Sequence, residues 1–380
     1  MLLEQLFELM AEKKASDLLL SAGSPITIKI QGTLLVVNQN KILNSSDIVN
    51  LVAPMLSEDS LKKLMIENDL NIGIKRPAIG NFRLSAFKQK GNISAVFRYI
   101  PNTPPSLEQL QIPGFVGNLI DEPRGLILIC GSTGSGKSTT IASMLQKRNN
   151  SRMGHILTIE DPIEFYLDSN KSLINQREIG TDASNIDAAL KNALRQTPDV
   201  IFIGEIRDHQ SMTAAISYAL SGYLVISALH ANNSYHALSR IVSMYPIEGR
   251  NTLLSDLSVS LKSVVTQRLV KTVKGDRVPA VEVMVNTQLT AHLIEHGRLS
   301  ELKEAMNKSL TKGSQTFDHH LMAYVNEGLV SLDEALNHAD SASNLMWLLN
   351  NQGINKSTEP VHTPVDRTAS GAQYKEFNFG

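Results

Sequence analysis

The sequence predicts an α/β protein in which a larger domain with a mostly parallel sheet follows a smaller α+β domain. From residue 122 to 290, apolar runs typical of buried strands alternate with segments of helical periodicity, which is the pattern of parallel strands joined by helices. A glycine-rich turn, GSTGSGKST at 131–139, connects one of these runs to the start of a helix. A proline-rich stretch between residues 101 and 113 separates this region from the first hundred residues and is typical of a linker.

Composition excludes several classes of protein. The chain has 380 residues, 42% of them hydrophobic and 19% charged, which is typical of a soluble globular protein with two domains. The net charge of -1 and an aromatic content of 5% indicate neither a basic stripe nor a stacking platform for nucleic acid. One cysteine, Cys130, excludes an intrachain disulfide and a cysteine-rich zinc site. The acidic start does not resemble a signal peptide and no apolar run reaches eighteen residues, so we expect membrane contact only through protein partners.

Residues 1–100 mix helix and strand signals and predict the smaller domain. A helix is expected up to about Lys14, because Leu3, Phe7 and Met10 follow helical spacing. Short apolar runs predict strands, and the last two, separated by a Lys-Gly-Asn turn, predict a hairpin. The expected strands are 15–20, 27–31, 33–37, 81–87 and 93–99.

After a linker at 101–121, the core domain is expected at 122–290, a helical region at 291–349 and a flexible polar tail at 350–380. Apolar residues recur at helical spacing over 253–269 and predict a long amphipathic helix there. The expected core strands are 126–130, 155–159, 200–204, 224–229 and 279–285. Further helices are expected at 185–196, 299–307, 314–326 and 331–348.

The turn at 131–139 fits the phosphate-loop pattern G-x-x-x-x-G-K-[ST], with the strand before it and the helix after it that the pattern requires. Backbone N–H groups of such a turn and of the helix N-terminus form an anion site. Lys137 is expected to reach the β- and γ-phosphates of ATP, and Ser138 to bind Mg²⁺. A plain glycine-rich surface turn is the alternative. The expected nucleotide-binding residues of the loop are Gly131, Ser132, Thr133, Gly134, Ser135, Gly136, Lys137, Ser138 and Thr139.

Three further polar segments follow predicted strands. Glu205 ends the strand in PDVIFIGEIRD and is the expected base that activates water; a surface acid is the alternative. Glu160, Asp161 and Glu164 are expected to hold Mg²⁺ through water, because neighbouring carboxylates repel one another without a cation. An exposed acidic turn is the alternative for them. His230 in ISALHANN is expected to sense the γ-phosphate or to contact the acids, and a structural histidine is equally compatible with the spacing.

The order of the motifs GSTGSGKST, LTIEDPIEF, PDVIFIGEIRD and ISALHANN, behind an α+β domain, resembles the secretion-type hexameric ATPases. The resemblance covers about residues 1–345 and is strongest to the type IV pilus retraction ATPases of the PilT/PilU family. It implies a RecA-like ATPase core, a PAS-like N-terminal domain, ATP and Mg²⁺ as cofactors, and a homo-hexamer. It also implies a cytoplasmic place at the inner membrane, a role in pilus retraction and twitching motility, and a PilT-like motor and a pilus platform protein as partners.

The resemblance assigns roles to individual residues. It places a Walker A motif at 131–138, an Asp box at Glu160, Asp161 and Glu164, a Walker B region at Gly204 and Glu205, and a His box at His230. Lys137, Glu164, Glu205 and His230 are therefore expected to be catalytic.

Arg83 and Arg98 match arginines that contact nucleotide phosphates in such hexamers, and neutralisation of phosphate charge by arginine is physically expected. Solvated hairpin arginines are the alternative.

Two departures from the family pattern are visible, and the second, together with a longer tail, favours the PilU side of the family. Ala228 stands where many relatives carry threonine, so one polar contact is expected to be absent. Residues 291–298 read AHLIEHGR, where PilT proteins carry the hallmark AIRNLIRE.

Three rival hypotheses remain open from the sequence. An extension or secretion ATPase of the PilB and GspE class is disfavoured, because such proteins usually carry a tetracysteine zinc module and a larger N-terminal region. A nucleic-acid motor with a related core is disfavoured by the near-neutral charge. A regulatory subunit that binds ATP without hydrolysing it is disfavoured by the presence of Glu205.

Overall fold

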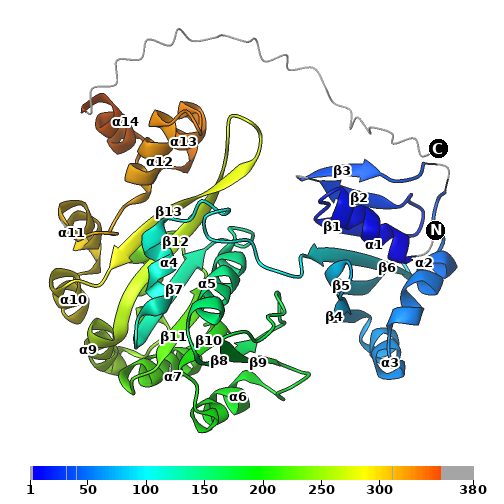
Figure 1. Cartoon of the computed structure of the whole chain (residues 1–380), viewed down its shortest axis with the longest axis horizontal. Helices are drawn as coiled ribbons and strands as arrows, with labels where there is room; N and C mark the ends of the chain where they lie inside the picture. The colour runs from blue at the N-terminus through cyan, green and yellow to red at the C-terminus, as the bar shows by residue number, and fades with distance from the viewer. Residues whose placement is uncertain (1–2, 31, 40, 310, 352–380) are drawn as a thin grey trace. The chain divides into compact units, whose positions relative to one another are not determined.

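The computed structural model describes residues 3–30, 32–39, 41–309 and 311–351. These form two compact units (Figure 1): the first holds the described residues up to 103 together with the segment 164–166, and the second holds 104–163 and the described residues of 167–351. The expected tail at 350–380 lies outside the described residues from 352 on. In the part of the chain that is described, no helix combines the length and apolar character needed to cross a bilayer.

The first unit is a six-stranded antiparallel sheet, in the order β3-β2-β1-β6-β5-β4, with helices packed on one face. Its core forms because alternate strand residues, such as Leu18, Leu84 and Phe97, meet apolar helix residues on that face. Phe7 of the first helix stacks on Phe82 with ring centroids 3.8 Å apart. The elements are α1 (Leu3–Glu12), β1 (Asp17–Leu20), β2 (Thr27–Ile30), β3 (Thr33–Val36), α2 (Ser45–Val52), α3 (Glu58–Glu67), β4 (Asp69–Arg76), β5 (Gly80–Gln89) and β6 (Asn92–Ile100).

The predicted hairpin of the first unit is confirmed as β5 and β6, whereas β4 was not predicted. The apolar residues of β4, Leu70, Ile72 and Ile74, alternate with polar residues and a glycine, so no continuous apolar run marks the strand. Its eight residues are nevertheless paired with β5 along their whole length. The alternation is itself typical of a strand with one buried face, and an expectation based on continuous apolar runs does not include it.

The second unit contains a seven-stranded sheet in the order β13-β12-β7-β11-β10-β8-β9. All neighbouring strands are parallel except β12 and β13, which form an antiparallel edge. The predicted α/β class with a mostly parallel sheet is therefore confirmed. The elements from the linker to the last strand are α4 (Gly114–Asn118), β7 (Gly125–Gly131), α5 (Lys137–Ser151), β8 (Gly154–Glu160), β9 (Ser172–Glu178), α6 (Ile186–Ala193), β10 (Val200–Glu205), α7 (His209–Leu220), β11 (Leu224–Leu229), α8 (Ser234–Ser243), α9 (Arg250–Ser260), β12 (Leu261–Lys271) and β13 (Arg277–Val285).

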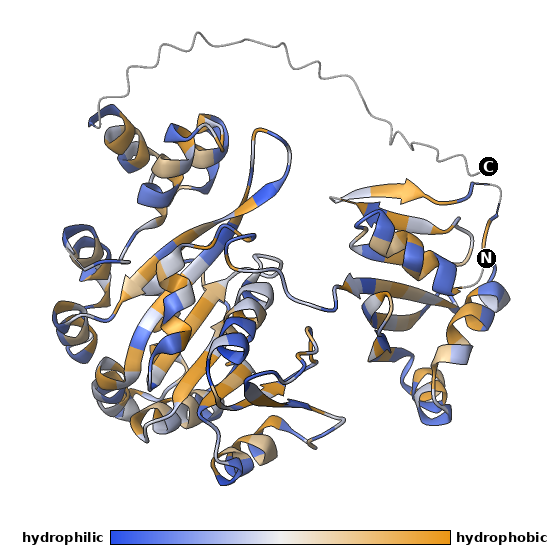
Figure 2. Ribbon diagram, viewed as in Figure 1, coloured by the Kyte–Doolittle hydropathy of each residue, from blue (hydrophilic) through white to orange (hydrophobic). Residues whose placement is uncertain are grey.

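Helices cover the seven-stranded sheet, and its central strands are largely hydrophobic (Figure 2). Leu126 and Leu128 of β7 belong to one core cluster with residues of α6 to α11, so those helices lie on one face. Ile127 and Ile129 alternate with them and point to the opposite face, the face of α5. Burial on both faces explains why β7 is a continuous apolar run.

In the described part of the chain up to residue 351, five α-helices follow the sheet and fall into two groups. The first group, α10 and α11, joins the core cluster through residues such as Ile294 and Leu302. The second, α12 to α14, packs on the far end of the β12–β13 pair, where Phe317 and Leu321 meet Val270 and Ala280. The five helices are α10 (Gln288–Glu295), α11 (Leu302–Lys308), α12 (Phe317–Asn326), α13 (Leu332–His338) and α14 (Ala342–Asn351).

The prediction of one helix over 253–269 is wrong. The helix α9 ends at Ser260, and the next residues form the eleven-residue strand β12, which pairs with β7 on one side and β13 on the other. The run at 264–266 is Val-Val-Thr, whose β-branched side chains fit a pleated sheet well. A strand buried on both faces lacks strict alternation, so its apolar residues also matched the helical spacing.

Two smaller differences have similar causes. The expected helix at 331–348 is interrupted between α13 and α14, where the backbone N–H groups of Asp340 and Ser341 point to the buried carboxylate of Asp318. The strand β9 was not predicted, because it is a polar edge strand with a single neighbour, β8.

Candidate nucleotide-hydrolysis site

The phosphate loop lies between the end of β7 and the start of α5, as the sequence predicted for the segment 131–139. Ser132, Thr133 and Gly134 are exposed, whereas Ser135 is buried, and Ser138 and Thr139 lie in the first turn of α5. The helix α5 starts after Gly136 without a side-chain cap and without an acidic residue in its first turn. Its first N–H groups and the positive end of its dipole are therefore suited to an anion.

Lys137 is 8% exposed, and its ammonium donates hydrogen bonds to the loop carbonyls of Gly131 and Ser132, both at 2.9 Å. These bonds hold the charged end of the side chain inside the loop. A phosphate oxygen is a stronger partner for an ammonium than a neutral carbonyl, because both groups are then charged. The geometry therefore fits a lysine that exchanges loop carbonyls for phosphate.

Gly131 is required by the way the loop packs. A Cβ atom at this position would lie 2.3 Å from the hydroxyl of Ser135 and 2.7 Å from the carbonyl oxygen of Gln267, and its φ of 151° is unfavourable for other residues. Gly136, with φ of 90°, provides the left-handed residue before α5. Gly131 and Gly136 are therefore needed for the backbone conformation of the loop. At the exposed Gly134, a Cβ atom would have no other atom within 4 Å.

Glu205 and His230 are brought together at neighbouring strand ends. The Nε2 atom of His230 lies 2.9 Å from Oε1 of Glu205, and its Nδ1 atom lies 3.3 Å from the carbonyl oxygen of Gly131. Both ring nitrogens thus face oxygen atoms that accept hydrogen bonds. His230 therefore connects the carboxylate to the phosphate loop, which is more than a purely structural histidine at a strand end requires.

A bulge in β10 directs Glu205 toward this contact. The pairing of β10 with β11 shifts between Ile203 and Glu205, so Gly204 has no partner in the ladder. A Cβ atom on Gly204 would lie 3.2 Å from the carbonyl oxygen of Ile159 on β8. Glycine therefore permits the close approach of β8, and the bulge re-aims the side chain that follows it.

Arg207 joins two of the acidic motifs and was not among the predicted site residues. Its Nε atom lies 3.1 Å from Oε2 of Glu205, and its guanidinium lies 3.6 Å from the carboxylate of Asp161. Its side chain is 62% exposed, so water screens these pairs and they are easily exchanged. The position of Arg207 inside the PDVIFIGEIRD motif was the available signal in the sequence.

Glu160 is the most enclosed carboxylate of the Asp box. It is 8% exposed, and its Oε1 atom accepts hydrogen bonds from the Thr158 hydroxyl at 2.6 Å and the Gln176 amide at 3.1 Å. Carboxylates and the Ser138 hydroxyl are oxygen donors, the type that Mg²⁺ prefers. Mg²⁺ commonly takes few protein ligands and completes its shell with phosphates and water, so this set of donors fits the ion.

The remaining predicted residues lie in the first unit. Glu164 falls in the segment 164–166. Arg83 and Arg98 are directly opposite each other on β5 and β6. Arg98 forms an ion pair with Asp17 at 3.0 Å, while its side chain stays 64% exposed.

Gln267 is a loop contact that the sequence prediction missed. It pairs with Gly131 across the β12–β7 ladder, and its side-chain amide donates a hydrogen bond to the carbonyl oxygen of Ser135 at 3.2 Å. It was missed because this segment was expected to be helical. Gln267 lies between Thr266 and Arg268, and this local pattern gives no signal that marks it as a loop contact.

Cys130, the last residue before the loop, is a fully buried free thiol, as expected. Burial raises its thiol pKa well above the ordinary value, so it stays protonated and unreactive.

Comparison with known proteins shows which family the chain belongs to. The model of the family described as Type II/IV secretion system protein matches residues 1–297. The type IV pilus ATPase PilU of Pseudomonas aeruginosa is 39% identical over 347 residues, which cover 91% of each chain. The pilus retraction ATPase PilT of the same organism is 37% identical, over 90% of this chain and 98% of PilT.

A crystal structure of the pilus retraction motor PilT with bound ADP superimposes with a TM-score of 0.84 at 33% identity, covering 91% of this chain and 99% of that one. The predicted family and the class of a P-loop ATPase core behind an N-terminal domain are thereby confirmed. The chain therefore belongs to the Type II/IV secretion system protein family, in the group that contains the type IV pilus ATPases PilT and PilU.

Proposed function

We propose that this protein is an ATPase that hydrolyses ATP to ADP and phosphate and couples this reaction to type IV pilus retraction and twitching motility. The observation that carries the proposal is the contact of Glu205 with His230, which also reaches the carbonyl of Gly131 in the phosphate loop. A loop that only binds nucleotide does not require a carboxylate linked to it in this way. The similarity to PilU and PilT over nine tenths of the chain supports the cellular role.

Each residue of the site has a proposed task. Lys137 and the loop N–H groups bind the β- and γ-phosphates, and Ser138 with the Asp box residues Glu160, Asp161 and Glu164 holds Mg²⁺ directly or through water. Glu205 removes a proton from the attacking water as a general base. A bound Mg²⁺ ion supplies charge neutralisation for the phosphates.

His230 and two arginines connect the reaction to motion. His230 senses whether the γ-phosphate is present, because it touches both the loop and Glu205. Arg83 and Arg98 of the first unit neutralise phosphate charge when nucleotide is bound. In this proposal, domain movement follows the loss of that charge on hydrolysis.

The proposed assembly is a homo-hexamer at the cytoplasmic side of the pilus machine in the inner membrane. A PilT-like motor and the pilus platform protein are the proposed partners, and contact with the membrane goes through such proteins. Binding to nucleic acid is not part of the proposal. The alternative is a pilus extension or secretion ATPase of the PilB or GspE class. Excess surface pili on a deletion strain would indicate retraction, and missing pili would indicate extension.

The test is deletion of the gene, followed by complementation with wild type, Glu205→Gln or Lys137→Ala. We expect the deletion strain and both variants to lose twitching and to keep or accumulate surface pili. Strains without pili would instead support the extension class. In parallel, purified protein should release phosphate from ATP without stimulation by DNA; strong stimulation by DNA would favour the nucleic-acid motor.

A further inference from the structure

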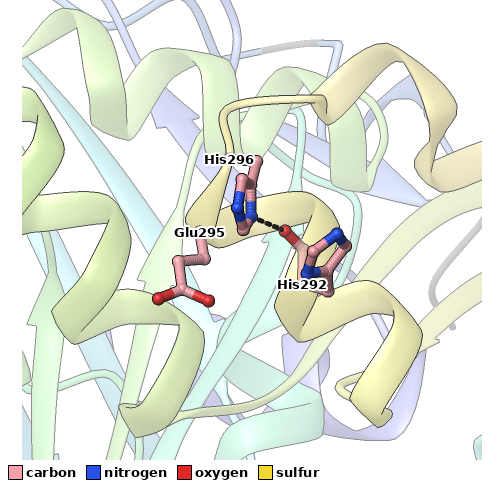
Figure 3. Close-up of side chains that lie close together, drawn as sticks. All are labelled: His292, Glu295 and His296. Carbon is pink, nitrogen blue, oxygen red and sulfur yellow. Dashed lines mark hydrogen bonds between the residues drawn. The ribbon is translucent and has the colours of Figure 1, made fainter.

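Three side chains with metal-binding atoms meet on the exposed face of α10, outside the nucleotide site. They are His292, Glu295 and His296, and one ligand atom from each lies within 4.8 Å of the other two (Figure 3). Among the residues that the structure describes, no other group of three histidine, cysteine or acidic side chains converges in this way. The group lies in the segment 291–298, where the sequence departs from the PilT hallmark.

The helix that carries the group is anchored and capped at both ends. Thr287 and Thr290 form a capping box at its start. Leu293 and Ile294 are buried in the core cluster, so the opposite face is exposed. At its end the Arg298 N–H group reaches the Leu293 carbonyl at 2.8 Å after the left-handed Gly297, which closes the helix. The three side chains therefore project from a rigid turn, which favours binding.

The hydrogen bond made by the ring of His296 leaves it a suitable lone pair. The Nδ1 atom of His296 lies 2.9 Å from the His292 backbone carbonyl, which only accepts hydrogen bonds, so this nitrogen carries the proton. The Nε2 atom is then the one with a free lone pair. A backbone carbonyl that holds the other ring nitrogen is the usual support of a metal-binding histidine.

The carboxylate of Glu295 is not bound by the nearest arginine in the sequence. Arg298 instead forms a two-pronged pair with Glu301, with its Nε atom 2.6 Å from Oε1. Two histidines separated by one helical turn, with a carboxylate beside them, offer two imidazole nitrogens and one oxygen. This combination is typical of sites for Zn²⁺ and unlike the all-oxygen sites of Mg²⁺ or Ca²⁺.

We propose that His292, Glu295 and His296 form a surface site for a divalent transition-metal ion, with Zn²⁺ as the preferred natural ligand. Bonds of about 2.0–2.1 Å place the ligand atoms of a tetrahedral zinc ion about 3.3 Å apart, so small side-chain rotations close the site. The fourth position is open to water. The site is independent of ATP hydrolysis, because none of its residues belongs to the nucleotide machinery.

The test is a zinc titration of the full chain without an affinity tag, against a chromophoric chelator, in excess Mg²⁺ and without nucleotide. We expect one zinc ion per chain, with affinity at least about tenfold weaker in His292→Ala and in His296→Ala. Glu295→Gln should weaken binding less than either histidine variant, because it keeps a neutral oxygen ligand. His236→Ala removes an exposed histidine outside the group and should bind zinc as wild type does.

Two results would overturn the proposal: no zinc binding by the wild type, or equal binding by the wild type and both histidine variants. Circular dichroism checks that the variants keep their helices. All four variants should hydrolyse ATP as the wild type does in the absence of zinc, so a failure of the proposed ATPase function remains distinguishable from a failure of this site.

Discussion

The two sheets of this protein position functional side chains in different ways. In the seven-stranded sheet the site residues follow the carboxyl ends of neighbouring strands: Gly131 ends β7, Glu205 ends β10, and His230 follows β11. In the six-stranded sheet Arg83 and Arg98 lie within strands, opposite each other on one face. Parallel strands all end at the same edge, whereas antiparallel strands bring residues together through their register.

The two sheets also differ in the electrostatic interactions between these side chains. The strand ends of the parallel sheet bring together groups of opposite charge or matching hydrogen bonds, such as Glu205 with His230 and Arg207. The antiparallel sheet places two like charges directly opposite each other, which is unfavourable, and only Asp17 is paired with Arg98. We infer that the groups at the strand ends of the parallel sheet are stable without a ligand. Binding of an anion, in contrast, would reduce the repulsion between Arg83 and Arg98.

The largest effect is expected at the strand ends. Glu205→Gln keeps the shape of the side chain but removes the base, so turnover should fall by about 10²–10⁴-fold while ATP still binds. Phosphate release and binding of a fluorescent nucleotide measure the two quantities. Turnover near the wild-type rate would show that this carboxylate is not the base.

The antiparallel edge of the larger sheet is an intermediate case, with a buried carboxyl group within a strand. Glu282 of β13 is 3% exposed and accepts hydrogen bonds from the N–H and hydroxyl of Ser234 at 2.7 and 2.8 Å. Burial raises the pKa of Glu282 from 4.5 to about 7. The folded protein then holds this proton between these two pH values while the unfolded chain has lost it, so stability falls as pH rises across that window.

Glu282→Gln should remove this pH dependence. Between pH 5 and 8 the wild type should lose roughly 2–3 kcal/mol more unfolding free energy than the variant. Urea denaturation, followed by the fluorescence of Trp347, the only tryptophan, measures the difference. The same change of unfolding free energy with pH in both proteins would mean that Glu282 ionises normally in the folded state.

Removal of one like charge tests the arginine pair. Arg83→Ala should reduce ATP turnover by about tenfold or more, because a positive charge near the phosphates is lost. The N-terminal sheet itself should become more stable by a few tenths of a kcal/mol, if it changes at all. Arg76→Ala is the matched control, since Arg76 lies in the same sheet and pairs with Glu4 at 2.8 Å. Equal turnover in the wild type, Arg83→Ala and Arg76→Ala would show that Arg83 is a solvated surface residue without a role in turnover.

The smallest effect is expected for the ion pair of Asp17 with Arg98. Arg98 is 64% exposed, so Asp17→Asn should cost less than about 1 kcal/mol of unfolding free energy. Amide hydrogen exchange of β1 and β6 reports the local stability. A cost above about 2 kcal/mol would show that the pair is effectively buried, and the contrast between the two sheets would then be smaller than we infer.

The sequence by itself determined the phosphate loop, the core strands that carry its neighbours and the family. The reason is physical: strand, glycine-rich turn and helix start are local, and each is encoded in about ten consecutive residues. The apolar runs of β7, β8, β10 and β11 are long and bounded by polar residues, so their type and end points could be predicted. The predicted site residues of the core therefore lie at strand ends, in loops or in the first turn of α5.

Only the tertiary structure decided what depends on pairing between distant strands. The division of 253–269 into α9 and β12 follows from the hydrogen bonds of β12 to β7 and β13. The same pairing places Gln267 in contact with the phosphate loop. The link from Glu205 through His230 to Gly131 joins three separate strands. Local periodicity carries no information about such neighbours, because their stabilisation comes from contacts between residues tens of positions apart in the chain.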